Sequence, residues 1–223
     1  MTINVRDYRP DIDGLRAIAV LSVVLYHAGL PYLPGGFVGV DIFFVISGFL
    51  ITRIIADEIA EGNFSILKFY ERRTRRIFPA LLVMLSVSII IASFVALPAE
   101  LEDFGTSLAA ATLFVSNIYF WQTADYFAGP AHLQPLLHTW SLAVEEQFYI
   151  VLPLLLIGLT RWMRAYLIPI LIAATLASFV LSVWAVGAKP NAAFYLLPTR
   201  FWELMVGALL ALGAVPAFKA RKW

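Results

Sequence analysis

Two ionisable side chains lie inside the first apolar stretch of the chain. Arg16 and His27 are eleven residues apart, so a helix over 15–29 would place them on one face, about three turns and roughly 16 Å apart. An ionisable side chain within a hydrophobic span is costly, which makes it a candidate for a functional site. The alternative is an arginine that snorkels to the lipid headgroups and a histidine hydrogen-bonded between helices.

A second group of candidate residues opens a later apolar stretch, in the block His138-Thr-Trp-Ser-Leu-Ala-Val-Glu-Glu-Gln-Phe-Tyr149. A carboxylate that faces inward could orient a histidine and raise its basicity, as in nucleophile–base–orienter arrangements. Glu145 and Glu146 would point about 100° apart on a helix, so at most one readily faces a given cavity. The simpler explanation is that negative charge is favourable at a helix N-terminus.

The third group is basic and precedes another apolar stretch. It consists of Arg72, Arg73, Arg75 and Arg76. Guanidinium groups bind phosphate oxygens in bidentate fashion, so the cluster predicts a phosphate clamp. The alternative is a topology anchor that binds anionic lipid.

Composition indicates the class of protein that must position these groups. The chain has 223 residues, of which 61% are hydrophobic and 14% charged, whereas soluble domains have about 45–50% apolar and 25% charged residues. We therefore expect an all-α, polytopic integral membrane protein. The absence of cysteine excludes disulfides, thiol nucleophiles and thiolate metal sites. No metal site, P-loop or dinucleotide-binding turn is expected, and nothing indicates nucleic-acid binding.

The apolar stretches predict six full spans and one re-entrant or partial helix. The full spans are expected at 15–29, 37–55, 77–97, 142–159, 166–186 and 201–215, and the weaker element at 104–121. The charged connection at 53–76 is expected to lie at the membrane surface. Pro79 is expected in the first turn of the third span, where its missing N–H costs little.

Basic residues orient these spans. Arg6, Arg9 and Arg16 place the N-terminus inside. If 104–121 crosses fully, the basic residues that follow it fall outside. If that segment is partial, or 122–139 dips back, they return inside, and we favour this arrangement. No cleavage site for a leader follows the first apolar core, so we expect a retained first span.

Several ordered blocks resemble one known family. They are Tyr8-Arg-Pro-Asp-Ile-Asp-Gly-Leu-Arg-Ala-Ile-Ala-Val, the Arg-x10-His spacing of Arg16 and His27, Gly39-Val-Asp-Ile-Phe-Phe-Val-Ile-Ser-Gly-Phe-Leu-Ile, the Arg-x2-Arg pair Arg73 and Arg76, and Trp140-Ser-Leu-Ala-Val-Glu-Glu-Gln-Phe-Tyr. The sequence resembles the membrane acyltransferase-3 family, the O-acyltransferases that modify bacterial surface polysaccharides, peptidoglycan and other hydroxylated acceptors. The membrane domain of that family has more spans. We therefore expect 1–223 to be its N-terminal part, without a soluble domain.

The resemblance implies partners and a location. The donor would be acyl-CoA, most simply acetyl-CoA, approaching from the cytoplasm. The acceptor would be a hydroxyl of an extracytoplasmic carbohydrate or lipid-linked glycan. The protein would lie among the lipids of the bacterial inner membrane, with a cytoplasmic N-terminus. No metal is implied.

The resemblance also implies roles for the candidate residues. His27 would act as general base or take the acyl group transiently, and Glu145 or Glu146 would orient its imidazole. The arginine cluster would bind the donor, with Arg73 and Arg76 on the phosphates. The residues expected to shape the cavity are Arg16, Asp13, Asp41, Trp140 and Ser141.

Two other functions fit the same residues. Buried His, Glu and Arg suit a proton-coupled transporter equally well on physical grounds, although the internal repeat common in such carriers is not evident. The chain could also be an inactive, truncated scaffold. The ordered blocks favour acyl transfer.

Overall fold

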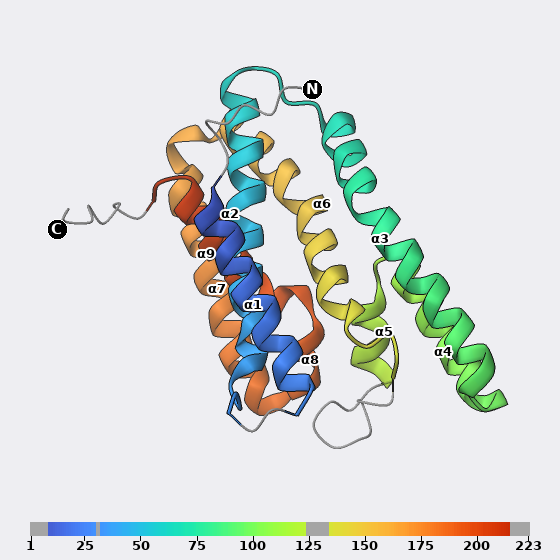
Figure 1. Cartoon of the computed structure of the whole chain (residues 1–223). Coiled ribbons are helices and arrows are strands. Elements are labelled where there is room, and N and C mark those ends of the chain that lie inside the picture. Colours follow the sequence, from blue (N-terminus) through green and yellow to red (C-terminus); the bar gives the residue numbers. More distant parts are fainter. Residues whose placement is uncertain (1–8, 30–31, 124–133, 215–223) are drawn as a thin grey trace. The chain divides into compact units, whose positions relative to one another are not determined.

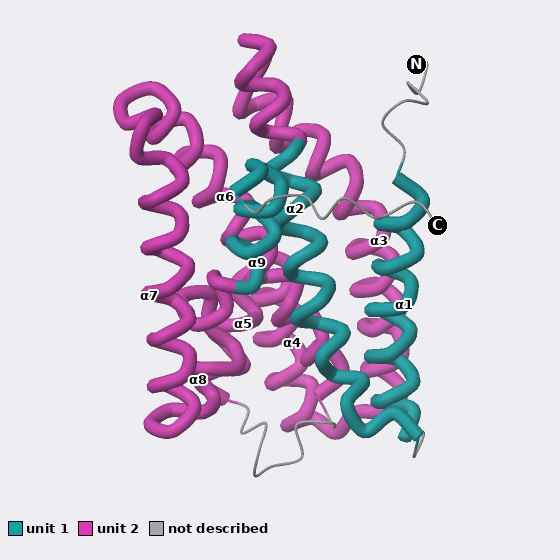
Figure 2. The backbone as a smooth tube through the Cα atoms, turned by 90° about the vertical axis from the view of Figure 1, so that its left-hand side faces the viewer, with its two compact units in different colours: residues 1–53, 203–223 teal, residues 54–202 magenta. Residues whose placement is uncertain are grey.

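The computed structural model describes residues 9–29, 32–123 and 134–214 (Figure 1). Every regular element within these ranges is a helix, which confirms the all-α prediction. The elements are α1 (Pro10–His27), η2 (Gly36–Val38), α2 (Gly39–Ala60), α3 (Ile66–Val95), α4 (Pro98–Thr112), α5 (Ser116–Thr123), α6 (Thr139–Trp162), η4 (Arg164–Tyr166), α7 (Leu167–Ala188), α8 (Pro190–Tyr195) and α9 (Leu197–Ala211). The chain divides into two compact units. Unit 1 comprises 1–53 and 203–223, and unit 2 comprises 54–202 (Figure 2).

Four helical segments of the described chain are long and apolar enough to cross a membrane. They are Gly36–Ala60, Ile66–Val95, Thr139–Trp162 and Arg164–Ala188. Each of the four corresponds to one of the six predicted full spans. The predicted spans at 15–29 and 201–215 are not among them, so the count of six is not confirmed. The helix α1 carries Asp11, Asp13 and Arg16 within its 18 residues, and α9 is only 15 residues long.

The charged connection at 53–76 is largely helical, and its expected place at the membrane surface stays a prediction. The helix α2 continues to Ala60, and α3 begins at Ile66 after Ser65, whose Oγ accepts a hydrogen bond from the Lys68 N–H. Glu, Lys and Arg are good helix formers, and the charged run therefore extends both helices. Pro79 consequently lies inside α3 rather than in its first turn.

The weak apolar stretch at 104–121 forms no single spanning helix. The helix α4 ends at Thr112 and α5 begins at Ser116, with Phe114 between them in the left-handed region at φ 55°. Neither helix reaches 18 residues, which agrees with the expected partial element. The helix α4 begins earlier than expected because the Glu100 carboxylate accepts a 2.8 Å hydrogen bond from the Leu97 N–H and caps it.

The helices of unit 1 pack closely through glycines. A Cβ on Gly36 would lie 2.7 Å from the Tyr26 Cβ, so η2 lies directly against the last turn of α1. A Cβ on Gly48 of α2 would overlap the Leu204 carbonyl of α9, and one on Gly207 would lie 2.6 Å from a backbone nitrogen of α2. Small residues allow membrane helices to approach this closely. The backbones of α2 and α9 are therefore in contact.

In unit 2, α6 packs against α5, α7 and α8. The largest fully buried side chains there include Phe120, Phe148 and Tyr195. Ser178 joins α7 to α9, because its Oγ donates to the Pro198 carbonyl at 2.7 Å and accepts from the Trp202 N–H at 3.0 Å. Side-chain hydroxyls satisfy backbone groups in this way where helices are irregular in a membrane.

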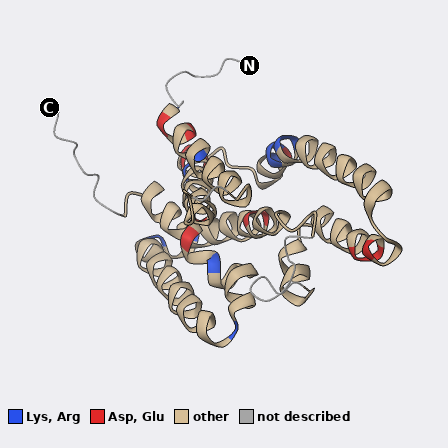
Figure 3. Ribbon diagram, turned by 60° about the horizontal axis from the view of Figure 1, so that its bottom comes forward, with Lys and Arg blue, Asp and Glu red and all other residues tan. Residues whose placement is uncertain are grey.

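Charged residues occupy few positions along these helices. Figure 3 shows the blue arginines gathered at the start of α3 and the red carboxylates at the start of α4. At the start of α1, Arg9 donates to Asp11 at 2.6 Å, and this hydrogen bond lowers the pKa of the Asp11 carboxyl to about 2. The exposed side chains of α7 include Ile172, Leu176, Phe179 and Val183, so the surface of this helix is largely apolar.

Candidate functional site

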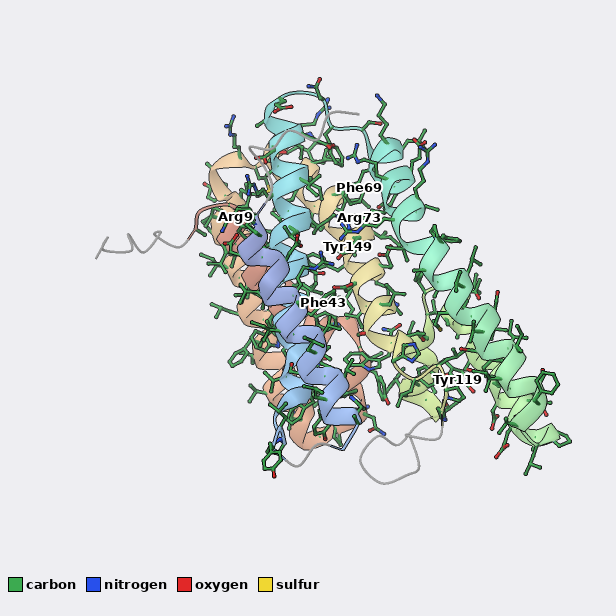
Figure 4. All side chains as sticks on the ribbon, in the orientation of Figure 1. Arg9, Phe43, Phe69, Arg73, Tyr119 and Tyr149 are labelled. Carbon is green, nitrogen blue, oxygen red and sulfur yellow. The ribbon has the colours of Figure 1, made fainter. Side chains whose placement is uncertain are left out.

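Arg16 is held between two helices of unit 1. Its Nη1 lies 3.8 Å from the Asp13 Oδ1 one turn earlier in α1, and its guanidinium lies 5.4 Å from the centre of the Phe43 ring of α2 (Figure 4 labels Phe43). Asp41 lies in the first turn of α2 and is half-buried. Arg16 and Asp13 thus lie side by side on α1, and their role in shaping a cavity stays a prediction. The stacking on Phe43 was not predicted.

His27 is the last residue of α1, and its side chain is exposed within unit 1 rather than buried as expected. The imidazole Nδ1 lies 2.8 Å from the Val23 carbonyl oxygen. Its ring meets the Tyr26 ring edge-on, with 5.2 Å between centroids. Within the described part of unit 1, no carboxylate contacts the ring. The imidazole is therefore anchored by its own helix and remains accessible.

The four arginines at the start of α3 are not equivalent. Arg72 pairs with Glu58 and Arg75 with Glu71, each at 2.7 Å. Arg73 is half-buried, with its guanidinium 5.0 Å from the centre of the Tyr149 ring; both residues are labelled in Figure 4. Arg76 is exposed and forms no ion pair with any residue that the structure describes. Two cations are thus neutralised by carboxylates, one lies on an aromatic face, and one is accessible.

The two glutamates of α6 lie near Arg73. Glu145 is buried and Glu146 half-buried, and both carboxylates interact electrostatically with the Arg73 guanidinium. The Tyr70 hydroxyl ties α3 to α6 by donating to the Tyr149 carbonyl at 3.4 Å. One carboxylate oxygen of Glu146 is buried with no hydrogen-bond partner in the described chain. Unit 2 therefore joins one predicted donor-binding arginine to both predicted glutamates.

A polar network that we did not predict closes the break between α4 and α5. The Gln147 amide donates to the Phe114 carbonyl at 3.1 Å and to the Asn117 Oδ1 at 2.7 Å. The Asn117 amide donates in turn to the Gln147 Oε1 and the Tyr195 carbonyl, both at 3.2 Å. An interrupted helix in a membrane must satisfy its carbonyls from elsewhere. The signal in the sequence that could have predicted this network is the polar content of the weak apolar stretch at 104–121, which includes Asn117.

Trp140 and Ser141 have local packing contacts. Trp140 is buried against Phe194, with 4.6 Å between ring centroids, and the Arg200 guanidinium lies 5.8 Å from its ring centre. The Ser141 Oγ donates to the His138 carbonyl at 3.2 Å. These contacts join α6 to α8 and to the start of α9. A cavity role for either residue stays a prediction.

The predicted site draws on both units. Unit 1 contributes His27, Arg16, Asp13 and Asp41, and unit 2 contributes the arginine cluster, Trp140, Ser141 and the two glutamates. The arrangement that would join His27 to a glutamate stays a prediction. Within the described ranges, no group of three or more His, Asp or Glu side chains could hold a metal ion.

Comparison with known proteins gives one family and several relatives. The model of a family described as an acyltransferase domain matches residues 9–216. The peptidoglycan O-acetyltransferase OatA of Listeria monocytogenes is 39% identical over 212 residues, which cover 92% of this chain and 34% of the relative. The O-acetyltransferase OatA of Staphylococcus aureus is 36% identical over 209 residues, with coverages of 92% and 34%. The chain thus spans about a third of the length of these curated relatives. No solved structure matches it.

Proposed function

Since this chain belongs to the acyltransferase domain family, which matches residues 9–216, we propose that it is part of a membrane O-acyltransferase. The acyl group, most simply acetyl, would pass from cytoplasmic acyl-CoA to a hydroxyl of an extracytoplasmic carbohydrate. The observation that carries this proposal is the family match, extended by relatives that are named as O-acetyltransferases. Because one relative is named for peptidoglycan, a cell-wall glycan or its lipid-linked precursor is the proposed acceptor.

The arginine cluster is the proposed donor-binding region. CoA carries several phosphates, and guanidinium groups bind phosphate oxygens strongly. The exposed, unpaired position of Arg76 within the described chain supports phosphate contact there. The basic start of α3 is proposed to face the cytoplasm of the bacterial inner membrane, because positive residues concentrate on that side. The N-terminus lies on the same side in this proposal.

The proposed chemistry centres on His27. The imidazole takes the proton of the acceptor hydroxyl while the oxygen attacks the thioester carbonyl. A C–O bond forms, the C–S bond breaks, and the proton then passes to the CoA thiolate, which restores the neutral imidazole. In the covalent variant, the same ring takes the acyl group before the acceptor does. In this proposal Arg16, Asp13 and Asp41 form the polar surroundings of the imidazole, and Glu145 or Glu146 is the carboxylate that would orient it.

The test is transfer of label from radioactive acetyl-CoA to glycan in membranes that contain the full-length protein. We expect His27→Ala to insert normally and to lower the transfer rate by about 100-fold or more, the usual contribution of a general base. Gln122→Ala is the control, because Gln122 is exposed on α5 and outside the proposed site. Undiminished transfer by an inserted His27→Ala protein would overturn the proposal.

A further inference from the structure

The hydrogen bond of His27 determines which ring nitrogen can react. Its Nδ1 lies 2.8 Å from the Val23 carbonyl oxygen. A carbonyl oxygen only accepts hydrogen bonds, so the proton of this bond must belong to Nδ1. A neutral imidazole has a single N–H, and Nε2 therefore carries the free lone pair.

The neighbours of His27 hold the ring in this position. Its ring lies edge-on to Tyr26, and Tyr26 meets the Phe37 ring with 5.5 Å between centroids. A Cβ at Gly36 would lie 2.7 Å from the Tyr26 Cβ, so η2 packs directly against this turn. All of these contacts lie within unit 1. Packing against Phe37 and Gly36 therefore positions the last turn of α1, and with it the imidazole.

We propose that the Val23 backbone carbonyl is the group that orients His27, so that Nε2 is the reacting nitrogen. This inference rests on the proposed function. It gives the carbonyl the orienting role expected of Glu145 or Glu146. Val23 is thus a positioning residue that acts through its main chain.

The position at the helix end also suits the charged intermediate. When Nε2 takes the hydroxyl proton, the ring becomes an imidazolium with Nδ1–H still donating to Val23. His27 is the last residue of α1, and the carbonyl end of a helix stabilises positive charge. The imidazolium then passes its Nε2 proton to the departing thiolate, and the Nδ1–H bond is unchanged throughout.

The first test is spectroscopic and does not depend on activity. The full-length protein is labelled with ¹⁵N-histidine and purified in detergent, and the His27 signals are identified as those lost in His27→Gln. Long-range ¹⁵N–¹H correlations then show which nitrogen is protonated, at a pH where free imidazole is neutral. We expect Nδ1–H. A His27 ring protonated at Nε2 would overturn the inference.

The second test replaces His27 by two isomers of equal size. Nε2-methylhistidine has no free Nε2, and when neutral it carries its lone pair on Nδ1, beside the Val23 carbonyl, so we expect it to lower acetyl transfer by about 100-fold or more. Nδ1-methylhistidine loses the bond to Val23 but keeps a free Nε2, so it should retain more activity than its isomer. The opposite order would overturn the inference. Full activity of His27→Ala would instead overturn the proposed function, while the tautomer result would stand on its own.

Discussion

Replacing Gln147 by methionine should destabilise the protein by removing the bonds that close the break between α4 and α5. Gln147 donates to the Phe114 carbonyl at 3.1 Å and to Asn117 at 2.7 Å, and accepts from Asn117 at 3.2 Å. Methionine fills nearly the same volume, so little cavity forms. The loss therefore reports on the hydrogen bonds.

The expected magnitude follows from these three bonds. A side-chain hydrogen bond within a membrane protein contributes about 0.6 kcal/mol, which gives a loss near 2 kcal/mol. For a chain of this size, 1 kcal/mol shifts the Tm by about 2–4 °C. We therefore expect Gln147→Met to lower the Tm by about 4–8 °C.

The assay is thermal unfolding in detergent, followed by circular dichroism. Gln122→Met is the matched control, because the Gln122 side chain is exposed on the neighbouring helix α5. Asn117→Ala combined with Gln147→Met should lower the Tm by less than the sum of the two single changes, since both remove the shared bonds. A Tm within 1 °C of the parent protein would refute the reasoning for Gln147.

Two further predictions concern helix packing and donor binding. Gly48→Leu should destabilise unit 1 by about 1–3 kcal/mol, because a Cβ at this position would overlap the Leu204 carbonyl. The control is Gly187→Leu, whose Cβ meets open space and which should leave the Tm unchanged. Equal Tm values for the two variants would contradict the close contact of α2 and α9. Arg76→Gln should raise the KM for acyl-CoA about tenfold, because it removes one charge-assisted contact. Arg72→Gln is the control: it removes a cation already paired with Glu58 and should change the KM less. Equal KM changes, measured as initial transfer rates against acyl-CoA concentration, would argue that Arg76 has no special role.

The apolar runs predicted α2, α3, α6 and α7, because a span long enough for the bilayer is readable from composition alone. The expected starts of α3 and α4 lie too late in the chain, because Ser65 and Glu100 cap the helices before the apolar runs begin. That error concealed a difference among the arginines. In a helix from Ile66, Phe69 and Arg73 share a face at i and i+4, and only then does Arg73 turn inward.

Other features depend on contacts that no local pattern contains. The left-handed backbone of Phe114 is unusual for an aromatic residue, and its carbonyl is satisfied by Gln147 in another helix. The blocks around Arg16, His27 and Glu145 identified the candidate site residues by type and spacing. They did not indicate that the Nδ1 of His27 would bond to its own helix, because nearby backbone carbonyls compete with distant side chains for such donors.

The most direct measurement of the central claim is the acyl content of cell-envelope glycans, determined by mass spectrometry in a strain from which the gene is deleted. The deletion should remove acyl groups of defined mass. The wild-type gene and Gln122→Ala should restore them, and His27→Ala, expressed and inserted to the same level, should not. Full restoration by His27→Ala, or an unchanged glycan profile in the deletion strain, would contradict acyl transfer through His27.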